Sequence, residues 1–200
     1  MIPSNVRVQN KPLRELKVIT CHLGAGASIT AIKCGKSIET SMGLTPLEGL
    51  VMATRSGDID PSIVFFLMKW EDMSIEEVYR LLNYKSGLLG VSGISKDLRE
   101  VKKAADRGDY RATLAIKVFA HRVKKYIGAY AAIMEGLDVL VFTAGIGEKA
   151  PWMRSLILEG LEFLGIEIDE NRNQNPEKYK GIISKENSRV KVLVVPTDEE

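Results

Sequence analysis

The 200-residue sequence has little cysteine or histidine, no long apolar run and almost no excess of charge of one sign. Cys21 and Cys34 form no C-x-x-C pair, which argues against a disulfide or zinc framework and predicts reduced, packed thiols in a cytoplasmic protein. Apolar stretches such as Ile63 to Met68 are too short to span a membrane, and the first residues contain no signal-peptide core. With 28 basic and 26 acidic residues, the net charge of +2 indicates neither a nucleic-acid partner nor a membrane surface.

What the sequence does contain is typical of a folded α/β domain, with 45% hydrophobic and 27% charged residues. After a lead-in at 1–16, one domain is predicted over 17–200, with a mixed sheet and flanking helices. Strands are expected at 17–23, 29–32, 138–143 and 189–195, and helices at 62–70, 74–82, 95–107, 110–135 and 151–164. The stretches 41–60, 87–93 and 171–176 are expected to be loops. The long helix should bury a face made by Leu114, Val118, Phe119, Tyr126, Ile127, Tyr130 and Met134.

Two glycine-rich turns follow apolar strands, HLGAGAS at 22–28 and TAGIGE at 143–148. Glycine permits positive φ and lets backbone N–H groups approach phosphate oxygens. A helix that begins soon after the second turn would favour an anion at its N-terminus. Each turn could equally be an ordinary tight turn, and neither matches a P-loop or a dinucleotide fingerprint. Two such turns in one domain indicate a phosphate-bearing ligand.

Three charged positions are candidates for handling that ligand. Arg55, in a loop of small residues, is suited to bidentate contact with phosphoryl oxygens, although it could instead pair with Asp58. Glu199 follows the last strand beside Asp198, where a hard carboxylate suits Mg²⁺, unless the end of the chain is simply solvated. Arg99 could stack on a base or pair with Asp97.

The two histidines and one lysine leave further alternatives open. His22 precedes the first glycine turn and could donate to a phosphate or be a core histidine, whereas His121 is expected to be solvated on the long helix. Lys149 could neutralise Glu148 or point at a phosphate.

Taken together, these segments resemble the acetate kinase family, whose acyl-phosphate chemistry takes place on an actin-like (ribonuclease H-like) fold. The matching stretches lie in the family's order across nearly the whole chain, and the second is long and specific. They are CHLGAGAS at 21–28, SMGLTPLEGLVMATRSGDIDP at 41–61, SGISKDLRE at 92–100, FTAGIGE at 142–148 and VLVVPTDEE at 192–200.

The resemblance implies a reversible transfer of phosphoryl from ATP to acetate, giving acetyl phosphate and ADP, with Mg²⁺ or Mn²⁺ as the metal. Arg55 matches the arginine that stabilises the transferring phosphoryl group, and Glu199 matches the metal-coordinating glutamate. The nucleotide-binding positions carried over from the family are His22, Leu23, Gly24, Ala25, Gly26, Asp97, Leu98, Arg99, Gly145, Ile146, Gly147, Glu148 and Lys149.

The sequence also departs from the family pattern. The first loop usually reads HLGNGAS, and here Ala25 replaces the asparagine; the second usually continues GIGEN, and here Lys149 stands at the asparagine. The family's N-terminal domain and its tail after the glutamate pair are not in this sequence, so the chain resembles the C-terminal, nucleotide-binding and dimer-forming half. A propionate or butyrate kinase relative, or a non-catalytic nucleotide-binding or dimerisation module, are the alternatives. The expected partners are acetate or acetyl phosphate, the N-terminal domain and a second copy.

Overall fold

The computed structural model describes residues 12–197 of the chain, which divide into two compact units. Within the described residues, unit 1 comprises 12–24, 28–41 and 123–197, and unit 2 comprises 25–27 and 42–122. We describe each unit separately. None of the helices within the described residues combines the length and the apolar character that crossing a membrane requires.

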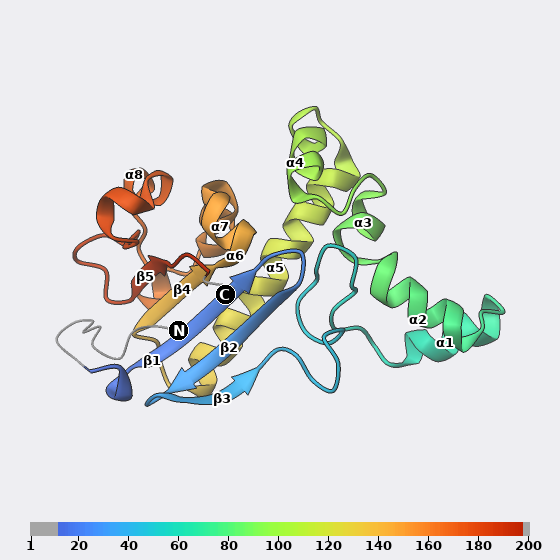
Figure 1. Cartoon of the computed structure of the whole chain (residues 1–200), viewed down its shortest axis with the longest axis horizontal. Coiled ribbons are helices and arrows are strands. Elements are labelled where there is room, and N and C mark those ends of the chain that lie inside the picture. Colours follow the sequence, from blue (N-terminus) through green and yellow to red (C-terminus); the bar gives the residue numbers. More distant parts are fainter. Residues whose placement is uncertain (1–11, 198–200) are drawn as a thin grey trace. The chain divides into compact units, whose positions relative to one another are not determined.

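Unit 1 is built on a mixed sheet, as the sequence predicted (Figure 1). Within the described residues the sheet has five strands, one more than the four expected. The strand order is β3-β2-β1-β4-β5, with β1 (Lys17–Leu23), β2 (Ala27–Lys33), β3 (Lys36–Thr40), β4 (Val139–Thr143) and β5 (Lys191–Val194). β4 lies parallel to both of its neighbours, β1 and β5, whereas β2 and β3 are antiparallel. Four of the five β4 residues are buried, which explains its unbroken apolar sequence. The carboxyl ends of β1 and β4 therefore meet at one edge of the sheet.

The helices of unit 1 follow β4. They are α6 (Ala144–Lys149), α7 (Pro151–Leu158) and α8 (Glu170–Gln174), with 3-10 turns η2 (Glu162–Leu164) and η3 (Pro176–Tyr179). Pro151 is the first residue of α7, as predicted, but the helix ends at Leu158 because Gly160 adopts a positive φ of 76°. The prediction of a loop at 171–176 was wrong over its first part, since Asp169 caps the N-terminus of α8 by accepting the Arg172 N–H.

Unit 2 consists mainly of helices. They are α1 (Ser62–Trp70), α2 (Ile75–Tyr84), α3 (Gly87–Ser92), α4 (Leu98–Asp106) and the first part of α5 (Tyr110–Ile133). The predicted helix at 62–70 and the Ser74–Glu77 capping box are confirmed. The prediction of a loop at 87–93 was wrong. α3 forms there because Gly87 takes a φ of +63° and the Leu88 and Leu89 N–H groups find carbonyls at Met52 and Ala53, which no local pattern could indicate.

The long helix α5 was predicted two residues too long, and its buried face was only partly correct. Phe119, Ile127 and Tyr130 are buried, but Leu114 is 39% exposed. Small residues such as Ala112 and Ala115 occupy much of the buried face instead. His121 is exposed, as expected.

Both cysteines are free, but only one is packed. Cys21 is buried in β1, and burial raises the pKa of its thiol. Cys34 is exposed at a positive φ of 55° in the β2–β3 turn, so the prediction that both thiols are packed was wrong for this residue.

Candidate functional site

The two glycine-rich segments lie on neighbouring strands of unit 1. His22 is paired in register with Thr143 in the parallel β1–β4 ladder, so Leu23-Gly24 and Ala144-Gly145 leave the sheet at the same edge. A Cβ placed on Gly147 would lie 3.4 Å from the Phe142 carbonyl carbon and 3.7 Å from the Cys21 oxygen. His22 is half-buried and Leu23 fully buried. The sheet thus brings the two predicted phosphate-binding segments together, at the edge where α/β proteins place their ligands.

The second glycine segment is a short helix rather than the predicted turn. Residues 144–149 form α6, and neither Gly145 nor Gly147 has a positive φ. The left-handed residue is Ala144, at φ +64°, a conformation that costs a non-glycine residue about 1 kcal/mol or more. Gly147 is buried against β4, whereas a Cβ on the exposed Gly145 would meet nothing within 4 Å. Gly145 is therefore the position at which a ligand could approach the backbone.

Side chains from distant parts of unit 1 hold α6 in place. The Ala144 N–H donates to Thr197 Oγ1 at 2.8 Å, and Glu148 Oε1 accepts from the Thr197 N–H at 2.9 Å and from its hydroxyl at 3.0 Å. Thr143 and Thr197 also share a hydrogen bond of 2.8 Å between their hydroxyls. The Glu148 carboxylate, predicted to bind the nucleotide, is thus engaged by the protein. Lys149, the next residue, is exposed.

A buried arginine that the sequence analysis missed completes this arrangement. Arg154, in α7, is 1% exposed and donates to the Gly147 and Glu148 carbonyls at 2.7 and 2.8 Å. Its remaining bonds go to the side chain and carbonyl of the buried Asn173. Desolvation lowers the pKa of Arg154 to about 10, so it stays charged at neutral pH. The signal in the sequence was an arginine in the otherwise apolar helix PWMRSLIL.

Unit 2 positions Arg55 through main-chain hydrogen bonds. Its segment has neither helix nor strand, as predicted, yet the Met52 N–H donates to the Arg55 carbonyl, and the Ala53 N–H donates to the Ala25 carbonyl. This second bond ties the segment to the first glycine turn. The half-buried Arg55 lies against Gly26, whose added Cβ would be 3.4 Å from Arg55 Nη1. The guanidinium contacts the Met52 sulfur at 3.5 Å.

The alternative pairing of Arg55 with Asp58 is not present. Asp58 accepts from Arg122 Nη2 at 3.2 Å and from the Gly49 N–H at 2.8 Å. Arg122 also donates to the Asp58 carbonyl, and its Nε is buried without a hydrogen bond. Among the residues that the structure describes, Arg55 forms no ion pair with a carboxylate. A half-buried guanidinium without a carboxylate partner is well suited to binding an anionic ligand.

The predicted base-binding segment begins with an ion pair, one of the two alternatives. Asp97 caps α4 by accepting the Arg99 N–H at 2.8 Å, and the Arg99 guanidinium contacts both carboxylate oxygens, with the shortest distance 2.6 Å. These bonds from Arg99 lower the pKa of Asp97 to about 2. Leu98 is buried, and the Arg99 side chain is 86% exposed. The outer face of this guanidinium remains open to solvent.

The predicted metal ligand, Glu199, lies outside the described residues together with Asp198. No group of three or more candidate ligands gathers anywhere in 12–197. Mg²⁺ commonly takes only one or two protein carboxylates, with phosphates and water supplying the rest. The carboxylates of Asp198 and Glu199 are the hard oxygen donors that this metal prefers.

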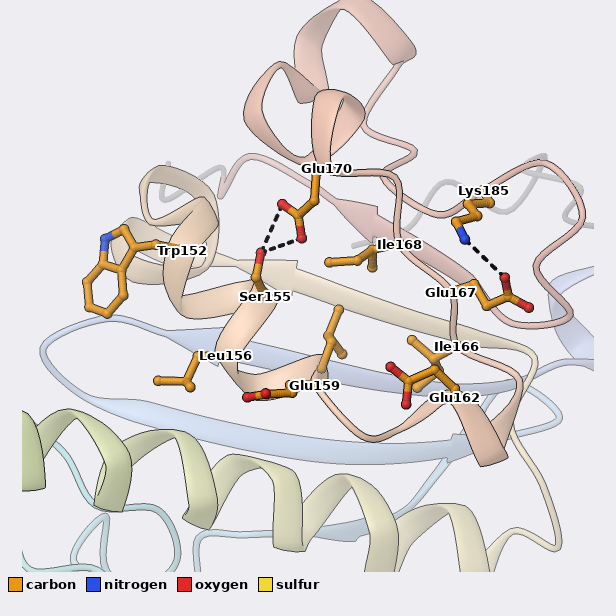
Figure 2. Close-up of a pocket in the computed structure, with 11 residues that line it drawn as sticks. Trp152, Ser155, Leu156, Glu159, Glu162, Ile166, Glu167, Ile168, Glu170 and Lys185 are labelled. Carbon is orange, nitrogen blue, oxygen red and sulfur yellow. Dashed lines mark hydrogen bonds and ion pairs between the residues drawn. The ribbon is translucent and has the colours of Figure 1, made fainter.

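A groove of about 540 Å³ on unit 1 contains none of the predicted site residues (Figure 2). Leu156 and Ile168 contribute apolar surface, and four glutamates line it: Glu159, Glu162, Glu167 and Glu170. Glu167 pairs with Lys185, and both Glu170 oxygens accept from Ser155 (Figure 2). The acidic lining makes the groove unsuitable for a phosphate-bearing ligand.

Comparisons with known proteins show the family of the chain. The sequence profile described as the acetokinase family matches residues 4–200. The chain is 61% identical over 191 residues to an acetate kinase of Dictyoglomus thermophilum, covering 95% of this chain and 47% of that protein. It is 60% identical over 194 residues to an acetate kinase of Caldanaerobacter subterraneus subsp. tengcongensis, covering 96% of this chain and 48% of that protein.

Solved structures give the same result. Porphyromonas gingivalis acetate kinase matches with a TM-score of 0.87 and 49% identity over 93% of this chain and 47% of its own. A propionate kinase from Francisella tularensis matches with a TM-score of 0.86 and 48% identity over the same shares.

The fold and its relatives define a domain of the α/β, actin-like ATPase type. The chain belongs to the acetokinase family. It spans about half the length of the curated relatives it matches.

Proposed function

We propose that this chain supplies the nucleotide and Mg²⁺ half of an enzyme that transfers phosphoryl from ATP to acetate. The observation that carries the proposal is the guanidinium of Arg55, which lies against the first glycine turn and forms no ion pair with a carboxylate among the described residues. In a folded protein such a half-buried cation is stabilised by an anionic ligand. The resemblance assigns this arginine to the phosphoryl group.

In the proposed reaction an acetate oxygen attacks the γ-phosphorus of ATP. The bond between that phosphorus and the oxygen bridging to the β-phosphate breaks, so acetyl phosphate and ADP result and no proton is required. The transition state is loose, with charge on the phosphoryl oxygens, and needs positioning and charge neutralisation. Arg55 provides such neutralisation, and bound Mg²⁺ supplies further positive charge when it is present.

The residues of the proposed nucleotide site are those that the resemblance assigns. The first turn, His22 to Gly26, and the start of α6, Gly145 to Gly147, would approach the phosphates through backbone N–H groups, and Lys149 would add its positive charge. The open side of Gly145 supports this role, because nothing in the protein lies within 4 Å of a Cβ there. We assign the adenosine to the segment of Asp97, Leu98 and Arg99, and the metal to Glu199.

Complementation tests the proposal. The chain would be mixed with a separately produced N-terminal half of an acetokinase, and acetate-dependent ADP release would be measured. We expect release to be restored and Arg55→Ala to reduce it by at least about 1000-fold, the scale of an arginine that stabilises a transferring phosphoryl group. Arg80→Ala is the matched control, because Arg80 forms only an exposed ion pair with Glu76 in the same unit. Equal losses in the two variants would contradict the proposal.

A propionate-specific relative is one alternative, because a propionate kinase is 48% identical to this chain, close to the 49% of an acetate kinase of known structure. A chain-length profile of the full enzyme with acetate, propionate and butyrate would separate these substrates. A non-catalytic module is the other alternative, since the chain covers about half of its relatives and has Ala25 in the first loop. MgADP binding without any restored turnover in the complementation experiment would favour it.

The proposed cytoplasmic enzyme also forms a homodimer, through the α1–α2 face of unit 2. α1 buries none of its residues, and large apolar side chains on the two helices are exposed: Phe65 70%, Phe66 52%, Trp70 67%, Ile75 74% and Tyr79 52%. An apolar surface of this kind is typical of a protein interface. Light scattering should give the mass of a dimer for the unmodified chain and of a monomer for Phe65→Ser. An unchanged mass would exclude this face.

A further inference from the structure

We propose that Glu148 and Thr197 form a latch that positions the second glycine segment, and that Glu148 contacts neither nucleotide nor metal. The inference deepens the proposed function and rests on it, because it assigns a role within the proposed nucleotide site. Its basis is the set of hydrogen bonds joining Thr143, Ala144 and Glu148 to a residue about 50 positions later in the chain.

The direction of each hydrogen bond follows from the hydroxyl of Thr197. That oxygen receives the Ala144 N–H, and its single proton goes to Glu148 Oε1, an acceptor-only carboxylate. Thr143 must therefore donate the third bond, so Thr197 Oγ1 accepts two and donates one. Glu148 Oε1 also accepts the Thr197 N–H. The N–H and the hydroxyl of Thr197 therefore both form hydrogen bonds with the segment.

The latch holds the backbone at its most strained residue, Ala144. Ala144, the first residue of α6, has a φ of +64°. Its N–H donates to Thr197, and Thr197 also donates to Glu148 near the other end of α6. Arg154 also holds α6, because it donates to the carbonyls of Gly147 and Glu148. Gly145 lies between these anchors with its open side exposed. Losing the latch would let the strained start of the segment relax and would move Gly145.

Substitutions that keep or remove the hydrogen-bond acceptor of Glu148 distinguish a positioning role from direct contact with a ligand. Glu148→Gln retains an oxygen that can accept both bonds from Thr197, and Glu148→Ala does not. Thr197→Ser retains the hydroxyl, and Thr197→Val removes it at nearly constant shape. Glu162→Ala, an exposed glutamate elsewhere in unit 1, is the control.

The first measurement is amide hydrogen exchange of the full chain without ligand. We expect exchange at Thr197 and Ala144 to be about 10-fold faster in Glu148→Ala, as expected for a lost charged hydrogen bond, and close to unmodified in Glu148→Gln. For Thr197→Val we expect the Ala144 amide alone to be faster by a similar factor, with Thr197→Ser unchanged. Unchanged exchange in both disrupting variants would overturn the latch, whatever the protein binds.

The second measurement is calorimetric titration with ADP, with and without Mg²⁺. We expect Glu148→Ala and Thr197→Val to weaken ADP binding about 10-fold, and by the same factor with and without Mg²⁺. Glu148→Gln and Thr197→Ser should bind ADP about as tightly as the unmodified chain. A loss confined to MgADP, or shared by Glu148→Gln, would make Glu148 a direct ligand and would overturn the positioning role. If the folded, unmodified chain bound no ADP even when mixed with the N-terminal half of an acetokinase, the proposed function would fail, and the positioning role with it. The exchange results would still stand.

Discussion

The two proposed phosphate-binding regions of this chain are held in different ways. In unit 2 the Arg55 segment is fixed by main-chain hydrogen bonds, from Met52 to Arg55 and from Ala53 to Ala25, and the Arg55 side chain is left without an acidic partner among the described residues. In unit 1 the segment 144–149 is fixed by side chains, with Glu148, Arg154 and Thr197 all engaged. Anchoring through the main chain leaves side chains available for ligands, whereas anchoring through side chains leaves the backbone of Gly145 available.

The largest effect should come from removing the buried arginine of unit 1. Arg154→Met leaves the Gly147, Glu148 and Asn173 carbonyls without a donor and should lower the free energy of unfolding by about 3 kcal/mol. Urea denaturation would measure this loss, with Arg107→Met at an exposed position as the control. A loss below about 1 kcal/mol would mean that side-chain anchoring of this segment is unimportant.

The Arg55 segment should instead be sensitive to its backbone. Gly57 has a φ of +67°, and an added Cβ would lie 2.5 Å from the Gly49 oxygen and 2.6 Å from the Leu50 oxygen. Gly57→Ala should therefore cost about 2 kcal/mol or more in unfolding free energy.

Gly108→Ala is the matched control for Gly57→Ala. Gly108 also has a positive φ, of 90°, but nothing lies within 4 Å of an added Cβ. Gly108→Ala should lower the free energy of unfolding by only about 1 kcal/mol, the cost of placing alanine at a positive φ. Equal losses in the two variants would show that the close approach to Gly49 does not matter.

Gly145→Ala should change nucleotide binding without harming the fold. The added methyl meets no protein atom, and alanine favours a helix by about 0.5–1 kcal/mol over glycine, so thermal stability should be unchanged or slightly higher. Calorimetry should show MgADP binding at least about 10-fold weaker. Gly128→Ala, at a second helical glycine with nothing within 4 Å, should leave binding intact. Unweakened binding in Gly145→Ala would remove this segment from the nucleotide site.

The smallest effect concerns Asp97. Its pKa is lowered from 3.8 to about 2, so the folded state binds its proton less readily than the unfolded state does. The stabilisation is present above about pH 4 and is lost as the pH falls towards 2. Because the pair with Arg99 is exposed, the contribution should be small. Asp97→Asn retains a capping side chain and should flatten the stability profile between pH 4 and 2; an identical profile would contradict this.

The sequence predicted much of the fold because the relevant signals are local. The apolar run at 138–143, the Ser74–Glu77 capping box and Pro151 at a helix start all gave elements close to those observed. The predicted loop at 87–93 and the predicted turn at 144–148 are short helices in the structure. The start of each helix depends on a positive-φ residue and on a partner far away in the chain, such as Met52 or Thr197.

The candidate site shows the same division. The residue types and their order were sufficient for the family. They left open whether Arg55 pairs with Asp58, and they did not place the two glycine segments after neighbouring parallel strands. Only the tertiary structure revealed that Asp58 pairs with Arg122, that Glu148 binds Thr197 and that a buried Arg154 holds the second segment. A sequence records which groups can form hydrogen bonds and pairs locally, but which distant partner each group finds is decided by the packing that brings them within 3 Å.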